Sequence, residues 1–207
     1  MTKRDYINSI IVGEIIALFF LILLFTLRAE IPEKLTFILE LRLFFPFIFP
    51  LLGFAVINIS SSIGKRWFIV SQLGKFCFVG LSNFMVDFGI LNLLIYFTGH
   101  DKGILFSVFK GISFIFALIN SYTWNKFWTF ESVETKSVFR QFLKFFSVIS
   151  AGLVVNVAIA SFVVNKYGSS VAVSSTLWAN FGALISLVFT VLWNFFGLRF
   201  FVFKSPD

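Results

Sequence analysis

Apolar segments of bilayer length recur along this chain, and they limit its fold more than any other feature. The first runs from Ile7 to Leu27, and five more follow at about 43–63, 75–98, 104–126, 143–165 and 173–197. A transmembrane helix needs about 20 predominantly apolar residues to cross the hydrocarbon core. Only 13% of the residues are charged, against about 25% in soluble domains, which excludes a water-soluble globular domain. We therefore predict an all-α, polytopic membrane helical bundle with six transmembrane helices.

Basic residues gather at the ends of the apolar segments rather than in a domain of their own. The formal net charge is +7, and eleven Lys and Arg fall on one side of the six-span arrangement against five on the other. Cytoplasmic loops carry such an excess, so the charge does not indicate a nucleic-acid partner. We expect a multi-pass protein of the cell membrane, plasma or inner, with cytoplasmic N- and C-termini. The first segment should remain uncleaved, because Leu27-Arg28-Ala29 is a poor signal-peptidase site.

Two stretches of the chain are similar enough to indicate an internal repeat. A gapless shift of 69 residues overlays turn glycines, Trp-Asn pairs and lysines: Gly99 on Gly168, Trp124 on Trp193, Asn125 on Asn194 and Lys75 on Lys144. Each copy contains two segments, so the copies should be parallel repeats about an axis along the membrane normal. We predict a four-helix domain at 72–204, with tight turns at Gly99–Gly103 and Lys166–Ser170, and an N-terminal extension with two spans at 1–66.

Asp87 is the most informative polar residue, because it lies midway along its segment, where a bare carboxylate is costly. Asn83 lies one helical turn earlier, and Lys110 is the natural partner in the next segment. At ~1.5 Å per residue, the two charged residues lie at ~15 Å and ~9 Å from the same end of the hairpin. A structural ion pair, a Lys110 that reaches the headgroups, and a role for the pair in substrate or proton movement all remain open. The repeat counterpart of Asp87 is Asn156.

Small polar residues recur at a spacing of four on both return segments, as Ala117, Ser121 and Asn125, and as Ser186, Thr190 and Asn194. Such stripes are usually packing surfaces in membranes. Asn125 and Asn194 differ, because aromatic and basic residues surround them: Trp124, Lys126, Trp128, Trp193 and Arg199. This combination fits an interfacial anchor, and it equally fits a site for a phosphate-bearing lipid headgroup, with cations and amides for the phosphate and aromatic faces for a sugar.

No catalytic set emerges from the sequence. His100 is isolated in a turn, Cys77 is the single cysteine, and no metal-binding, P-loop or dinucleotide motif is present. We therefore predict neither catalytic residues nor a cofactor or metal. Glu14, inside the first segment, either faces another helix or reaches the membrane surface, or else serves transport.

Four short motifs carry a resemblance to a known family. They are Lys75-Phe76-x-x-Val79-Gly80, Asn120-x-x-x-Trp124-Asn125-Lys126-x-Trp128-Thr129-Phe130, Phe142-x-Lys144-Phe145, and Asn194 with Arg199-Phe200-Phe201-Val202-Phe203. From about Gln72 to Lys204 the chain resembles the GtrA-like family of small membrane proteins of polysaccharide and cell-envelope biosynthesis. Residues 1–66 lie outside the family pattern, and Ile149-Ser150 replaces the small residues usual near the start of the third span.

The resemblance implies a non-enzymatic flippase or translocase for a polyprenyl-phosphate-linked sugar in contact with membrane lipid. The head would enter near Arg140 and the motif cations and follow a polar seam. The expected substrate-binding or translocation residues are Asn83, Asp87, Lys110, Asn120, Ser121, Trp124, Asn125, Lys126, Trp128, Lys144, Asn156, Thr190, Asn194 and Arg199. The alternatives are a membrane anchor or assembly partner for a polyprenyl-phosphate glycosyltransferase, and a small-multidrug-type exporter that uses Glu14 or Asp87. A membrane glycosyltransferase and a second copy of the chain stay open as protein partners.

Overall fold

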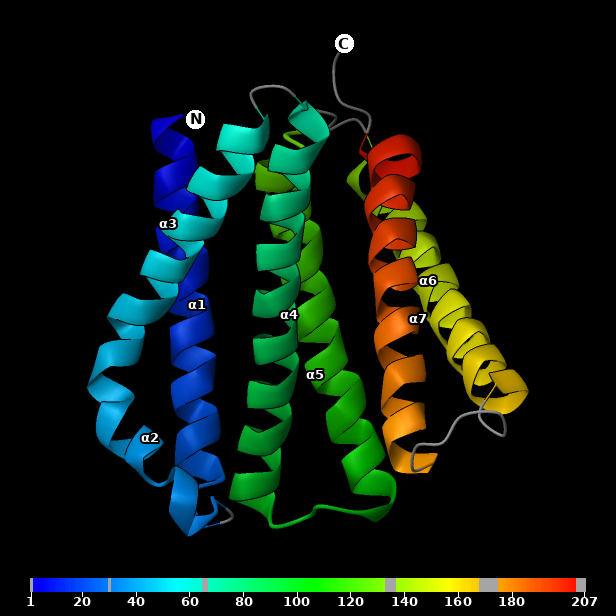
Figure 1. Cartoon of the computed structure of the whole chain (residues 1–207). Helices are drawn as coiled ribbons and strands as arrows, with labels where there is room; N and C mark the ends of the chain where they lie inside the picture. Colours follow the sequence, from blue (N-terminus) through cyan, green and yellow to red (C-terminus); the bar gives the residue numbers. More distant parts are fainter. Residues whose placement is uncertain (1, 30, 65–66, 133–136, 168–174, 204–207) are drawn as a thin grey trace. The chain divides into compact units, whose positions relative to one another are not determined.

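The structure, a computed structural model, describes residues 2–29, 31–64, 67–132, 137–167 and 175–203. These residues form helices joined by turns (Figure 1). The α-helices are α1 (Lys3–Thr26), α2 (Phe37–Glu40), α3 (Phe45–Gly64), α4 (Phe68–Thr98), α5 (Gly103–Trp124), α6 (Val138–Tyr167) and α7 (Ser175–Gly197). Short 3₁₀ turns, η1 (Glu33–Leu35) and η2 (Leu41–Phe44), flank α2, and π-helical turns follow α5 and α7 as η3 (Asn125–Thr129) and η5 (Leu198–Val202).

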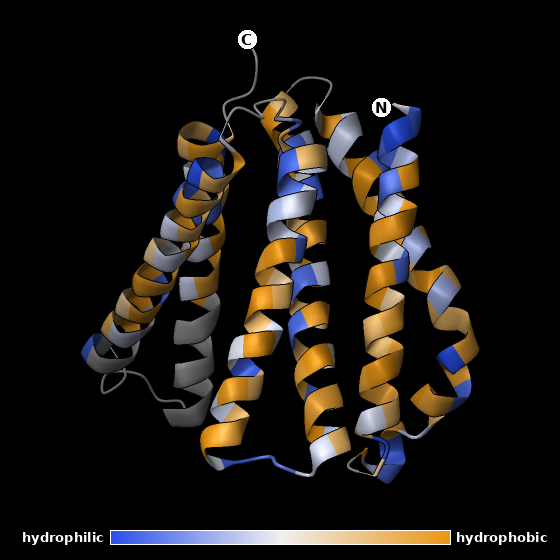
Figure 2. Cartoon of the chain, turned by 180° about the vertical axis from the view of Figure 1, so that it is seen from behind, coloured by the Kyte–Doolittle hydropathy of each residue, from blue (hydrophilic) through white to orange (hydrophobic). Residues whose placement is uncertain are grey.

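Within the described part of the chain, six helical stretches are long and apolar enough to cross a membrane. Figure 2 shows that hydrophobic residues cover most of their length, with hydrophilic positions scattered between. The all-α, polytopic class predicted from the sequence is therefore confirmed, and the chain is a multi-pass membrane protein.

The helix boundaries follow local signals in the sequence. α1 begins with a capping box, in which the Asp5 backbone N–H donates to Thr2 Oγ1 at 3.3 Å and the Thr2 N–H donates to Asp5 Oδ2 at 3.0 Å. α4 ends at Gly99, whose φ of 69° is left-handed and whose N–H bonds the Ile95 carbonyl at 2.7 Å. The predicted turn at Gly99–Gly103 is confirmed. The second predicted turn at Lys166–Ser170 lies largely outside the described residues.

The chain divides into two compact units, Met1–Thr129 and Phe130–Asp207. In the first unit α4 packs against α1, α3 and α5, and α1 also packs against α3. The two helices of the N-terminal extension therefore lie against the first predicted repeat. The division into domains at 1–66 and 72–204 stays a prediction.

The core of the first unit joins four elements. Its buried members are Val12 and Ile16 of α1, Ile57 of α3, Phe78 and Val79 of α4, and Trp128 of η3. Two glycines allow the backbones to approach: a Cβ at Gly13 would lie 2.6 Å from the Pro50 backbone, and one at Gly53 would lie 2.6 Å from the Phe78 ring. Close approach at small residues is a main source of helix association in membranes.

In the second unit, α6 packs against α7 and an aromatic cluster fills the end at which η5 lies. The Phe130 ring lies 5.8 Å from Phe195 and 5.4 Å from Phe203, and Phe203 lies 6.1 Å from Phe145. Gln141 at the start of α6 donates to the Val202 carbonyl at 3.3 Å. The phenylalanine-rich composition thus serves packing here.

The two π-helical turns correct the register of the repeat. A gapless shift would place the counterpart of Asn125 at Asn194, but the second turn begins at Leu198. Moving the return segments by four residues, about one helical turn, aligns Lys126 with Arg199 and Phe130 with Phe203. A shift of about one helical turn keeps each residue on the same helix face, so the gapless shift of 69 residues still matched well.

The tight contact between α1 and α3 predicts that Gly13→Ala is destabilising. The new methyl group would force the Pro50 backbone to move, at about 1–3 kcal/mol. Gly80→Ala on α4 is the matched control, because no described atom lies within 4 Å of a Cβ added there. The thermal unfolding midpoint in detergent should fall for Gly13→Ala and hold or rise for Gly80→Ala. Equal midpoints would contradict the packing.

Candidate functional site

The predicted ion pair between Asp87 of α4 and Lys110 of α5 is present. Ser113, one turn beyond Lys110, is fully buried and donates from Oγ to Asp87 Oδ1 at 2.6 Å. The Lys110 ammonium also lies 5.7 Å from the centre of the Phe88 ring. Asp87 therefore has one cation and one hydroxyl as partners, in the middle of two apolar helices.

A second polar layer lies about one turn along the same helix pair. The Asn120 side-chain amide donates to Asn83 Oδ1 at 2.7 Å and to Ser82 Oγ at 3.2 Å. Together with the Asp87 group, this layer forms what we call the seam: Ser82, Asn83, Asp87, Lys110, Ser113 and Asn120. The seam joins α4 to α5 through side chains alone.

The second hairpin has a smaller version of this arrangement. Asn156 of α6 donates to Thr190 Oγ1 of α7 at 3.0 Å. Gly152 lies so close to Asn194 that a Cβ there would be 2.2 Å from Asn194 Oδ1. Both units thus use polar contacts within a hairpin, and the Asn156–Thr190 contact of the second is neutral. A single path through both halves, as the sequence suggested, stays a prediction.

A buried cluster lies at the end of the first hairpin where α4 begins and η3 follows α5, which we call the motif end. The Lys75 ammonium lies 2.5 Å from Asp5 Oδ1, and both side chains are 9% exposed. The Trp128 indole N–H donates to the same oxygen at 3.2 Å. Arg4 donates to the Phe127 carbonyl at 2.7 Å. The first turn of α1 is thus bonded to two residues of the family-like motifs, Lys75 and Trp128.

Lys126 at the motif end is surrounded differently. Its side chain is 2% exposed, and its ammonium donates to Tyr122 Oη at 3.4 Å, beside the Tyr122 and Phe127 rings. It forms no ion pair with any described residue. Asn125 donates to Ser121 Oγ at 3.2 Å, and Trp124 lies edge-on to Trp128 at 6.0 Å.

The remaining predicted residues are less enclosed. Lys144 and Arg140 are exposed on α6, and Arg199 is half-buried with its guanidinium 5.9 Å from the Phe200 ring. Glu14 is exposed on α1 and makes no hydrogen bond to a described residue. The structure therefore gathers the predicted residues of the first hairpin more closely than those of the second.

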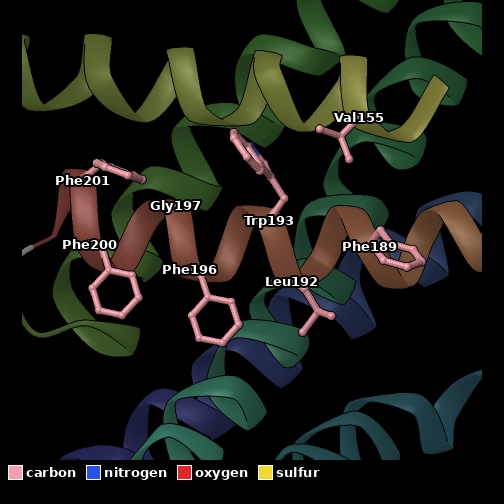
Figure 3. A pocket seen from close by; sticks show the side chains of 8 residues that line it. All are labelled: Val155, Phe189, Leu192, Trp193, Phe196, Gly197, Phe200 and Phe201. Atoms are coloured by element: carbon pink, nitrogen blue, oxygen red, sulfur yellow. The ribbon is translucent and has the colours of Figure 1, made fainter. Parts of the chain in front are cut away.

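An apolar groove of about 330 Å³ runs along α7 in the second unit. Figure 3 shows Trp193 pointing toward α6, while Leu192, Phe196 and Phe200 extend from the other side of α7. The Trp193 N–H donates to the Val148 carbonyl of α6 at 3.1 Å, and the Phe196 and Phe200 rings stack. These side chains present no polar group to the groove, which suits contact with hydrocarbon.

Three bonded residues escaped the sequence analysis. Ser113 lies three residues after Lys110, so helical spacing alone would have placed both on one face. Ser82 precedes Asn83 and had no distinct signal. Asp5 resembles an ordinary helix-capping residue, and nothing local indicates its pairing with Lys75.

A comparison with family models gives one match that covers most of these elements. The model for the GtrA/DPMS transmembrane domain matches residues 75–203. This range includes the seam, the groove, and the motif end except for α1 and the part of α4 before residue 75.

Two curated proteins are similar to the chain. Uncharacterized membrane protein YngA of Bacillus subtilis (strain 168) is 29% identical over 140 residues, which is 65% of this chain and 80% of the relative. Dolichol-phosphate mannosyltransferase of Pyrococcus furiosus is 33% identical over 87 residues, which is 42% of this chain and only 23% of that protein. No solved structure matches the chain.

The Asp5–Lys75 pair predicts a specific pattern in a double-mutant cycle. Lys75→Met leaves a buried carboxylate without its cation, and Asp5→Asn leaves the buried cation, so each should destabilise by about 3–5 kcal/mol. The double variant should recover much of that loss, because no uncompensated charge remains. Thermal unfolding of the four proteins measures the coupling. Additive losses would show that the two groups do not depend on each other.

Proposed function

We propose, since this chain belongs to the GtrA/DPMS transmembrane-domain family, that it is a non-enzymatic translocase of a polyprenyl-phosphate-linked sugar. Dolichol phosphate, in the name of one relative, is a lipid of this class. The protein would lie in the cell membrane with both termini in the cytoplasm. Its place would be in the assembly of cell-envelope polysaccharide or glycan, where a sugar built on one face is used on the other.

The seam is the observation that carries this proposal. Unpaired burial of a sugar hydroxyl in hydrocarbon costs several kcal/mol, so a crossing head group needs polar groups along its way. The seam supplies carboxylate, amide, hydroxyl and ammonium groups within one apolar helix pair. Polar residues at this depth are costly and usually functional.

During transport, the seam residues would exchange the hydrogen bonds they make with one another for hydrogen bonds to the sugar. In the resting arrangement Asn120 bonds Asn83, and Lys110 with Ser113 bonds Asp87, so these polar groups are paired with one another across α4 and α5. A sugar hydroxyl can both donate and accept, so it can replace either partner of these bonds. A neutral interhelical bond such as Asn120–Asn83 contributes about 0.6–2 kcal/mol, which is small enough for exchange.

The direction of transport would follow the concentration of the lipid-linked sugar or protonation of Asp87. The sequence contains no P-loop. The polyprenyl chain would stay in the bilayer, and the apolar groove on α7 offers it a protein surface. Lys110 would release Asp87 when the carboxyl group is neutral.

A membrane anchor for a glycosyltransferase is the second candidate. The match to the Pyrococcus protein spans 23% of a chain named as a mannosyltransferase, so a related segment occurs as part of a larger enzyme chain. The exposed start of α6, with Arg140 and Lys144, would then be the docking surface.

Transport is tested by reconstitution in proteoliposomes with a fluorescent polyprenyl-phosphate sugar. Asn120→Leu should slow the flipping rate about tenfold or more, because it removes donors from the seam and about 1.4 kcal/mol of barrier gives a tenfold change. Asn92→Leu is the matched control, since Asn92 of α4 bonds only its own helix at the Phe88 carbonyl. Equal rates for Asn120→Leu and wild type would refute the seam as the path.

The anchor hypothesis predicts the opposite sensitivity. Arg140→Glu with Lys144→Glu would release a co-purified glycosyltransferase, whereas Asn120→Leu would leave it bound. An affinity pull-down from membranes separates the two cases. Retention of the enzyme by the charge-reversed protein would reject this docking surface.

A further inference from the structure

The motif end of the first hairpin contains buried polar atoms that the protein itself does not satisfy. Gln72 Oε1 of α4 and Asn125 Oδ1 and Thr129 Oγ1 of η3 are inaccessible to solvent and have no hydrogen-bond partner among the described residues. The three side chains are 4%, 1% and 1% exposed. Buried polar groups are bonded in the great majority of cases, so three exceptions on two elements that pack against each other, α4 and η3, indicate a missing partner.

Lys126, in the same turn, is a buried cation that has no anion as partner among the described residues. Its contacts are one long hydrogen bond to Tyr122 Oη and two aromatic rings at 5.5 Å and 5.6 Å. Attraction to aromatic faces is weaker than the penalty for removing an ammonium group from water. A negative charge is needed to complete this environment.

Lys75 is a second buried cation in this region, and the protein supplies its counter-ion. Asp5 neutralises it, and the Trp128 N–H and Thr2 bond the same carboxylate. Every strong interaction there is supplied by the chain. The contrast singles out Lys126, because both lysines are buried and, within the part of the chain that the structure describes, Lys75 alone of the two has a counter-ion.

We propose that Lys126, Thr129, Asn125 and Gln72 form a binding site for a sugar-phosphate head group. The Lys126 ammonium and the Thr129 hydroxyl would donate to phosphate oxygens. The side-chain carbonyl oxygens of Asn125 and Gln72 would accept from sugar hydroxyls. A ligand with an anion and several hydroxyl donors matches all four groups, whereas a simple anion would leave both carbonyls unsatisfied.

The geometry of η3 supports this assignment. A π-helical turn carries one more residue per turn than an α-helix and is found disproportionately at functional sites. Here it packs against α4, which brings Gln72 and the η3 side chains to one end of the hairpin. The assignment rests on the proposed class of substrate. It identifies Lys126, within the family motif, as the residue that binds the phosphate.

The test compares Lys126→Met with Lys75→Met in the full chain, held in phosphatidylcholine nanodiscs. Lys126→Met removes an uncompensated charge, so its thermal midpoint should equal or exceed that of wild type. Its affinity for a polyprenyl-phosphate hexose should fall about tenfold or more, and Lys126→Arg should restore most of it. Lys75→Met should lower the midpoint. Thr129→Val, which deletes a hydroxyl without a partner, should keep the midpoint and weaken binding.

The probes separate the parts of the ligand. Polyprenyl-phosphate hexose should bind more tightly than polyprenyl phosphate, and the uncharged polyprenol and inorganic phosphate should bind weakest. Asn125→Leu should abolish the difference between the hexose-bearing and bare lipids. Wild-type binding that Lys126→Met does not change, or a Lys126→Met midpoint as low as that of Lys75→Met, would overturn the site.

Transport and binding can fail separately. Binding that depends on Lys126, without flipping in proteoliposomes, would leave this site standing and reject the translocase. Flipping that slows with Asn120→Leu, together with unchanged binding by Lys126→Met, would reject the site alone.

Discussion

A lipid bilayer offers no hydrogen-bond partners, and the arrangement of this protein follows from that constraint. Each polar group on a membrane helix must find its partner inside the chain or in a ligand. Asp87 finds Lys110 and Ser113, Asn83 finds Asn120, and Asp5 finds Lys75. The helices α1, α4 and α5 are therefore fixed relative to one another by a few bonds placed on an apolar background. The same constraint makes the unsatisfied groups near Lys126 conspicuous.

The two hairpins share an arrangement of helices and turns, but their polar residues make different contacts. Both close with a π-helical turn, and both open with a lysine on the second turn of a long helix. In the first hairpin this lysine is buried against α1, while its counterpart Lys144 is exposed. The seam of the first hairpin holds charge, and the Asn156–Thr190 pair of the second is neutral. The N-terminal extension thus accounts for part of the difference, because it supplies the Asp5 carboxylate that pairs with Lys75.

Much of the fold and part of the site could be predicted from the sequence. Span lengths and the turn at Gly99 follow from local composition, and helical rise alone placed Asp87 within reach of the Lys110 side chain. The register of the return helices was misplaced by four residues, since one turn of slip preserves the helix face and leaves the pattern almost unchanged. The pairing of Asp5 with Lys75 could not be predicted, because it joins distant segments and Asp5 also serves as a local cap. Burial of Lys126 was hidden for a related reason, as Trp and Lys at a helix end usually mark an exposed anchor.

The bond network around Asp5 also orders the biogenesis of the protein. Chains enter the membrane from the N-terminus as they are made, so α1 and α3 can meet through Gly13 and Pro50 while α4 is still unsynthesised. The Asp5 carboxylate has no Lys75 partner until α4 has been made, and its bond to the indole of Trp128 forms only after α5 has followed. Trp128 is the last of these three residues to be made. A ribosome that stalls before Trp128 would therefore leave α1, α3, α4 and α5 without the bond between Asp5 and Trp128.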